Sequence, residues 1–153
     1  MRLSVRGEYV LRALVVLGFN YGHGVVRART IAQDQNIPLR FLEQILNNLK
    51  DEGILESKRG TAGGYRLSRP PEQINLATVI RAIDGPLAPV SCVSEKFYEK
   101  CSCPDEERCG IRSVMKEVRD AVVQIMERVT VADLCERFRK LQGERVNPFD
   151  YII

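Results

Sequence analysis

The pattern of apolar and polar residues is most regular in the middle of the first half of the chain. In residues 38–50, apolar side chains recur at steps of three and four, as they do on one face of a helix. Gly53 suits the left-handed position that ends a helix. Two short runs, residues 54–57 and 65–67, then flank a basic, glycine-rich stretch and predict a β-hairpin. A helix with one polar face followed by a basic hairpin predicts a winged helix-turn-helix that reads DNA.

The same periodicity predicts further helices on both sides of this segment. Residues 4–19 have a broad apolar face with Ser4 as a helix N-cap, and residues 28–34 would form the first helix of the helix-turn-helix. Asn75 would cap a helix over residues 76–83. A stretch rich in proline and glycine follows, and we place the end of the first domain there, at residue 85.

A long amphipathic helix is predicted over about residues 105–129, where apolar residues again step by three and four. Such a helix after a complete small domain needs an apolar partner surface, and we expect a second copy of the chain. Packing only on its own domain is the alternative. A last helix to about residue 141 would turn Leu134 and Phe138 inward, and Cys135 on it would be an ordinary buried thiol.

The predicted fold is therefore mainly α with a small β-wing. It comprises a winged helix-turn-helix domain (1–85), a cysteine-bearing loop (86–109), a dimerisation helix with a C-terminal helix (105–141), and a tail (142–153).

Composition adds a location and a charge distribution. The 153-residue chain is 44% hydrophobic, but it has no apolar run of the roughly 20 residues that span a bilayer. Charged residues interrupt the apolar positions at the N-terminus, so no signal peptide is predicted. We expect a cytoplasmic protein without a membrane partner. Residues 1–85 hold 12 Lys and Arg against 8 Asp and Glu, so the basic excess lies with the part predicted to bind DNA.

Four of the five cysteines lie within eighteen residues: Cys92, Cys101, Cys103 and Cys109. In a cytosolic chain such a cluster indicates metal or redox chemistry before disulfides. With Pro104 in a first helical turn, Cys103 would be the N-cap of the long helix, whose N-terminus would lower thiol pKa values. Four sulfur ligands suit an iron–sulfur cluster or zinc, although the Cys-x2-Cys pair of structural zinc sites is missing. A thiol switch without metal remains open.

Several segments, in order along the chain, resemble IscR/NsrR/RirA-type bacterial transcription regulators, the Rrf family of winged-helix regulators. They are MRLSVRGEYVLRAL, IPLRFLEQILNNLKDEGIL, KRGTAGGYRLSRP, INLATVIRAIDG and CVSEKFYEKCSCPDEERCGIRSVMKEV. The resemblance implies a homodimer that binds a palindromic operator in double-stranded DNA. It also implies an iron–sulfur cluster, [2Fe–2S] or [4Fe–4S], that changes the affinity for DNA.

The resemblance also suggests ligands for the cluster. Cys92, Cys103 and Cys109 match the three usual cysteine ligands, and Cys101 is an extra candidate as second or fourth ligand. Arg112 stands where IscR-like members have a histidine ligand, and it cannot ligate. In NsrR-like members an acidic residue of the other subunit takes this role. Glu8 is at the similar place, and a plain surface carboxylate is the alternative.

Pattern and resemblance together suggest which residues face DNA. The helix over residues 38–50 would be the reading helix, the one that enters the DNA groove. Arg40, Glu43 and Gln44 lie at the start of its polar face, where side chains reach the base edges. Arg59 at the wing tip would enter a minor groove, with Lys58 and Arg66 on phosphates. Gly60, Gly63 and Gly64 would let the wing backbone turn and approach DNA. For each of these, the alternative is a solvated surface residue.

Together these features predict a homodimeric transcription regulator that senses iron–sulfur, redox, nitric-oxide or iron status through a cysteine-ligated cluster. One alternative is a metal-free regulator that uses a thiol switch or a protein partner. Another is a cluster carrier or electron-transfer protein on a winged-helix scaffold. We expect no enzyme, because a single histidine and the lack of a nucleophile–base pair leave little for acid–base chemistry.

Overall fold

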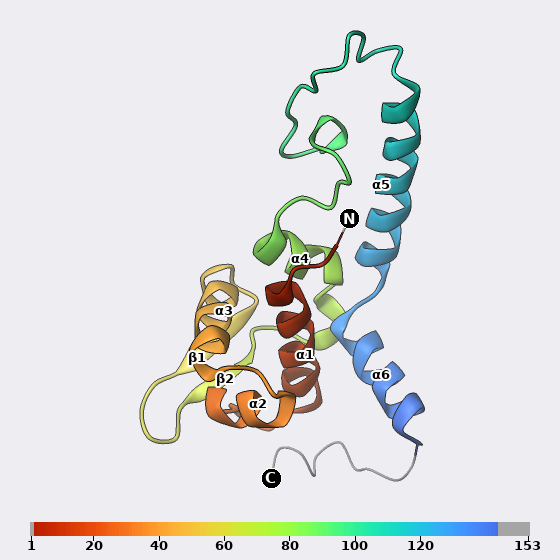
Figure 1. Ribbon diagram of the computed structural model, residues 1–153. Helices are drawn as coiled ribbons and strands as arrows, with labels where there is room; N and C mark the ends of the chain where they lie inside the picture. Colours follow the sequence, from red (N-terminus) through yellow and green to blue (C-terminus); the bar gives the residue numbers. More distant parts are fainter. Residues whose placement is uncertain (1, 144–153) are drawn as a thin grey trace.

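A helical unit with a two-stranded wing lies at one end of the molecule, and a long helix with a preceding loop rises from it (Figure 1). The structure, a computed structural model, describes residues 2–143. The helical unit contains α1 (Val5–Phe19), α2 (Ala28–Gln35), α3 (Leu39–Asp51), β1 (Leu55–Lys58), β2 (Gly64–Leu67), the 3₁₀ turn η1 (Pro71–Gln73) and α4 (Leu76–Asp84). The 3₁₀ turn η2 (Ser91–Val93), α5 (Gly110–Arg128) and α6 (Val131–Gln142) follow.

Helix α1 is the centre of the core. It contacts α2, α3, α4, α6 and β2, and its residues Val10, Leu14 and Leu17 are buried. Ser4 caps it as predicted, since its hydroxyl oxygen accepts a hydrogen bond from the Gly7 backbone N–H at 3.0 Å. The apolar face of α3 closes the core from the other side. Its buried residues are Leu42, Ile45, Leu46 and Leu49.

The segment after α3 forms the predicted wing. Gly53 ends the helix region with a φ of 74°, and β1 then pairs with β2 in antiparallel register, with Leu55 opposite Leu67. Val26, in the lead-in to α2, adds a short bridge to Tyr65, with two backbone hydrogen bonds of 2.8 Å. Helix, turn, reading helix and wing therefore occur in the predicted order, and the winged helix-turn-helix is confirmed.

The long helix begins later than predicted. It starts at Gly110 with Cys109 as its N-cap, so Cys103 is not a cap and Asp105 does not lie in a first helical turn. The acidic side chains have other partners: Asp105 accepts from the Arg108 backbone N–H at 3.2 Å, and Glu106 accepts from the Tyr98 hydroxyl at 2.7 Å. These contacts hold the segment before Gly110 as a loop.

Helix α6 packs back onto α1. Thr130 and Asp133 form a reciprocal capping box at its start, and Val131 and Cys135 are buried against the core. Cys135 is thus the buried thiol that was predicted. Phe138 was expected inward, but its side chain is 38% exposed. The next residue, Arg139, contacts α1, with its guanidinium over the Phe19 ring at 5.1 Å from the ring centre.

Candidate functional site

The outer face of α3 is polar and open to solvent. Arg40, Glu43 and Gln44 are all exposed there, opposite the side that is buried in the core. The wing is joined to this helix by a contact that the sequence did not indicate. The Tyr65 hydroxyl donates a hydrogen bond to Oδ1 of Asn47 at 2.9 Å, which fixes the base of the wing against the reading helix.

The tip of the wing is basic and exposed, with Lys58, Arg59 and Gly60 in the open. Gly60 has a φ of 101°, a conformation that favours glycine. Arg27 donates a hydrogen bond to the Thr61 carbonyl at 2.6 Å, so the tip is tied to the lead-in of α2. Arg66 lies further from the tip and forms an ion pair with Glu56 at 2.9 Å.

The two remaining wing glycines are needed for space within the protein. A Cβ on Gly63 would lie 2.2 Å from the Lys58 carbonyl oxygen, and one on Gly64 would lie 2.4 Å from that of Val26. Neither position has the positive φ that would require glycine for conformational reasons. These glycines let the hairpin close and let it dock on the segment before α2. Their close approach to DNA stays a prediction.

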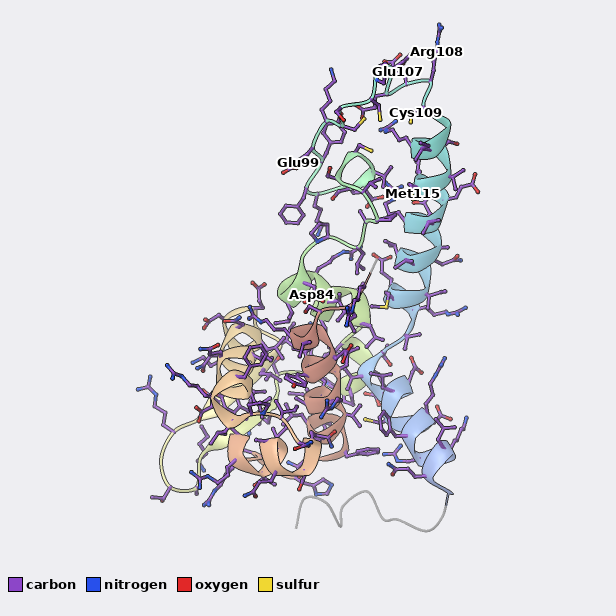
Figure 2. The ribbon with its side chains drawn as sticks, in the orientation of Figure 1. Asp84, Glu99, Glu107, Arg108, Cys109 and Met115 are labelled. Carbon is purple, nitrogen blue, oxygen red and sulfur yellow. The ribbon has the colours of Figure 1, made fainter. Side chains whose placement is uncertain are left out.

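The four clustered cysteines lie at the end of the molecule away from the wing. Figure 2 shows Cys109, with Glu107 and Arg108, at the start of α5, far from Asp84 at the end of α4. The thiols interact in pairs along a chain: Cys92 with Cys101, Cys101 with Cys103, and Cys103 with Cys109. The fold therefore brings together four side chains that are separated by up to seventeen positions in sequence.

These contacts shift the thiol pKa values in opposite directions. A hydrogen bond from Cys103 lowers the pKa of Cys101, while the same pair, with burial and the neighbouring Cys109, raises the pKa of Cys103 to about 11. Burial raises the pKa of Cys92. The expected lowering at Cys103 is wrong, because that residue is not at a helix N-terminus and donates to its neighbour instead.

The four thiols, which interact only in successive pairs, do not form a geometric metal site in the protomer. Within residues 2–143, no three His, Cys, Asp or Glu side chains are arranged to hold a metal ion. Glu8 is exposed in the first turn of α1, and no interaction joins it to the cysteines of its own protomer in the part described. The donor set itself, four thiols linked in successive pairs, is of the type that ligates iron–sulfur clusters.

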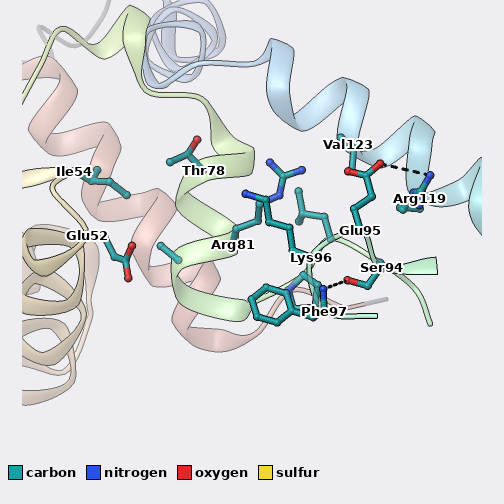
Figure 3. Close-up of a pocket in the computed structure, with 14 residues that line it drawn as sticks. Glu52, Ile54, Thr78, Arg81, Ser94, Glu95, Lys96, Phe97, Arg119 and Val123 are labelled. Atoms are coloured by element: carbon teal, nitrogen blue, oxygen red, sulfur yellow. Dashed lines mark hydrogen bonds and ion pairs between the residues drawn. The ribbon is translucent and has the colours of Figure 1, made fainter. Parts of the chain in front are cut away.

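A cavity of about 390 Å³ lies where α4, α5 and residues 94–97 meet (Figure 3). Arg81, Arg119 and Lys96 contribute positive charge to its lining, and Leu87, Phe97 and Val123 contribute apolar surface. The sequence had not indicated this cavity, because its walls come from separate segments that only the folded chain brings together, including Glu52 and Ile54 as well as α4, α5 and the loop.

The reading helix, its tethered basic wing and the helix-turn-helix define a DNA-binding transcription regulator of the winged-helix class. Residues 3–137 match the family model Rrf2, described as an iron-dependent transcriptional regulator, and the chain belongs to this family. Among residues 2–143, no helix is long and apolar enough to cross a membrane.

Individual relatives agree with this assignment. An HTH-type transcriptional regulator described as rrf2-like, from Rhodobacter capsulatus, is 37% identical over 86% of this chain and 91% of that protein. The structure of CymR, the global cysteine regulator of B. subtilis, has a TM-score of 0.75 at 29% identity, covering 90% of this chain and 98% of that one. The structure of IscR from T. potens also has a TM-score of 0.75, at 25% identity, with 95% and 94% covered.

Proposed function

We propose that the protein is a homodimeric regulator that senses an iron–sulfur, redox, nitric-oxide or iron signal through a cluster on its clustered cysteines. The observation that carries the proposal is the position of four thiols that interact in pairs at the N-terminal end of α5, a long helix with an exposed stripe of apolar residues beside the side that packs on α4. Similarity to IscR and the iron-dependent description of the family support it.

The dimer follows from the apolar face of α5. No residue of this helix is fully buried, and Ile111, Val114, Val118 and Ile125 are exposed by 71%, 53%, 40% and 53%. Their spacing puts them on one side of the helix. Full burial of such a side chain contributes roughly 1.5–3 kcal/mol, and about half of that is still to be gained because each is about half exposed in the protomer. A second α5 offers the same stripe, so a two-fold pairing buries both.

The cysteines would hold the cluster. Cys92, Cys103 and Cys109 are the first choice as ligands, with Cys101 as second or fourth, and with Glu8 of α1 as an alternative fourth ligand supplied across the dimer. The cluster, [2Fe–2S] or [4Fe–4S], would supply a centre that changes or is lost when oxidants, nitric oxide or iron shortage act on it. The protein's part is to hold the thiols together at the base of the loop and to link that loop to α5.

Purification without oxygen tests the cluster most directly. We expect a coloured protein containing iron and sulfide, and single Ser variants of Cys92, Cys103 and Cys109 that lose both. Cys101→Ser should also lose iron and sulfide if Cys101 is a ligand, and should keep them if it is only a neighbour of the cluster. Cys135→Ala is the matched control, because that thiol lies in the core. A colourless, iron-free wild type that still binds its operator tightly would reject the cluster.

DNA reading is tested on an operator selected from a pool of random duplexes. Gln44→Ala should relax the preference at one base position, with a loss of roughly 1–3 kcal/mol on the preferred sequence. Lys58→Ala should weaken binding to all sequences alike. It should also reduce the slope of log affinity against log salt concentration by about one, the amount expected for one lost phosphate contact. If neither variant changes binding, α3 and the wing are not the DNA-facing elements.

A thiol switch without metal is the second candidate. The hydrogen bond between Cys101 and Cys103 favours thiolate at the first and thiol at the second, which makes Cys101 the better nucleophile. A structure of CymR from Staphylococcus aureus in an oxidized form is among the relatives, at 27% identity and a TM-score of 0.71. Peptide mapping after hydrogen peroxide decides: a disulfide among the four clustered cysteines, with DNA affinity changed in parallel and no iron present, would favour the switch.

A further inference from the structure

The backbone carbonyls of Cys92 and Val93 accept hydrogen bonds from two arginines of the long helix α5. The turn η2 makes its own hydrogen bonds only through earlier carbonyls: Val93 N–H donates to the Val90 carbonyl at 3.3 Å, and Ser94 N–H donates to the Ser91 carbonyl at 3.1 Å. The carbonyls of Cys92 and Val93 are left at the end of the turn, where a short helix cannot satisfy them itself. Both residues are buried.

Arg112 provides the first of these contacts. Its Nε donates to the Cys92 carbonyl at 3.2 Å, and the same Nε lies 3.3 Å from a carboxylate oxygen of Glu106. Glu106 in turn accepts a hydrogen bond from the Tyr98 hydroxyl at 2.7 Å. Arg112 therefore ties Cys92 on one branch of the loop to Glu106 on the other.

Arg119 provides the second contact, two helical turns further along the same face of α5. Its Nη1 donates to the Val93 carbonyl at 2.6 Å, and its side chain is only 12% exposed. Glu95 lies 3.7 Å away (Figure 3), and Asp120 pairs with the same guanidinium, so carboxylates compensate the arginine charge where it is held.

We propose that Arg112 and Arg119 are positioning residues for Cys92. They fasten the first cysteine of the cysteine-bearing loop (86–109) to α5 through its backbone, so that Cys92 and the long helix move as one body. Their long side chains reach consecutive carbonyls from two turns of the helix, which fixes the direction of the turn as well as its distance. The consequence for sensing rests on the proposed function, but the fastening itself does not.

The test is the rate at which iodoacetamide alkylates each cysteine of the full-length, reduced, metal-free protein, followed by peptide mass spectrometry. A charged hydrogen bond protects a buried group against local opening, so Arg119→Gln should speed alkylation of Cys92 about tenfold. Arg119→Lys, which keeps the charge and a donor, should fall between Gln and the wild type. Arg112→Gln should act in the same direction once the rate is divided by the thiolate fraction of Cys92, because the charge of Arg112 also lowers the pKa of that thiol.

Arg108→Gln is the matched control, since this arginine has a 90% exposed side chain and its ion pair with Asp105 is a loose 3.8 Å. It should leave Cys92 unchanged. Cys135, buried in the core, reports global unfolding. Cys92 accelerating with Cys135 unchanged supports the proposal. Equal rates in wild type and Arg119→Gln, or a parallel rise at Cys135, overturns it.

Cluster reconstitution gives a second readout. The visible circular-dichroism spectrum of the reconstituted Arg119→Gln protein should differ from that of wild type, because the first ligand is held in another orientation, while Arg108→Gln should match wild type. If wild type takes up no iron, the cluster proposal fails. The alkylation rates still decide whether the arginines hold Cys92.

Discussion

Substituting Gly64 by alanine tests how the wing is attached to the DNA-binding unit. An added Cβ would lie 2.4 Å from the Val26 carbonyl oxygen and 2.6 Å from its carbon, both backbone atoms that cannot rotate away. The Val26 segment and β2 would have to separate. We therefore expect Gly64→Ala to weaken both the fold and DNA binding.

The expected loss can be worked out from the contacts that separation breaks. Val26 and Tyr65 exchange two backbone hydrogen bonds of 2.8 Å, each contributing roughly 0.5–1.5 kcal/mol. Val26 is also buried, and partial exposure of its side chain would cost about 1 kcal/mol more. The free energy of unfolding should fall by about 2–4 kcal/mol, a large part of the roughly 5–15 kcal/mol of a typical domain.

Urea unfolding followed by circular dichroism measures the loss of stability, and fluorescence anisotropy on a labelled operator measures DNA affinity. Gly110→Ala is the matched control, because nothing lies within 4 Å of its added Cβ and its φ is not in the left-handed region. It should keep or slightly raise stability, as alanine favours helix. A Gly64→Ala protein within about 0.5 kcal/mol of wild type, with equal affinity, would refute the reasoning.

Three further predictions concern α5 and α6. Val118→Lys places a charge in the exposed apolar stripe and should raise the dissociation constant of the dimer at least about tenfold in sedimentation experiments, whereas exposed Lys116→Ala should not. Burial raises the pKa of Cys135 to about 11 from 9.0; the unfolded thiol therefore ionises first, and unfolding free energy should fall between these pH values by up to about 3 kcal/mol more in wild type than in Cys135→Ala. Hydrogen bonds from Thr130 lower the pKa of Asp133, so Asp133→Asn should cost about 1 kcal/mol at neutral pH, and the difference from wild type should shrink as acid protonates the wild-type carboxylate; a difference that grows in acid would contradict this.

Local sequence signals predicted the elements that depend on local interactions. Ser4 and Asn75 cap the helices that follow them as predicted, each accepting a bond from a backbone N–H three residues away, and Thr130, which was not predicted as a cap, does the same. The apolar period of α3 was sufficient because four of its residues face a single core. These features were readable because each involves residues within one or two helical turns.

The predicted start of α5, at about residue 105, was wrong because contacts between more distant residues decide it. Proline followed by acidic residues is a sound helix-start signal, but Glu106 is bound by Tyr98, eight residues earlier, and by Arg112. A tertiary contact thus overrode a local preference. The Tyr65–Asn47 bond and the cavity beside α4 were missed in the same way, since their partners are distant in sequence.

In the candidate site, too, local spacing predicted one part and folded geometry decides the rest. Cysteine spacing was enough to indicate a cluster of thiols, and the fold does bring Cys92, Cys101, Cys103 and Cys109 into contact. Which of them would bind metal depends on geometry that spacing does not contain. Glu8 depends in addition on a second protomer, because it would act across the dimer.

The two ends of α5 explain how a change at the cysteines would reach DNA. Its C-terminal end is bonded to the helical unit by two backbone hydrogen bonds of 2.9 Å, from Leu76 N–H to the Val129 carbonyl and from Val131 N–H to the Ile74 carbonyl. An ion pair of 3.1 Å between Arg81 and Glu127 adds to them. Nearer the N-terminus, Arg112 in the first turn and Arg119 at the middle of the helix hold the Cys92 turn.

A helix of 19 residues is about 28 Å long and bends little, so it links these two ends as a lever. Helix α4, fixed to this lever, also contacts α3, and its Asp84 accepts a hydrogen bond from the Ser4 backbone N–H at the start of α1 at 3.0 Å. A rotation imposed at the cysteines would therefore turn the helical unit as a whole rather than unfold it. In a dimer, such a rotation changes the separation and angle of two intact reading helices, which is the quantity that a two-fold operator measures.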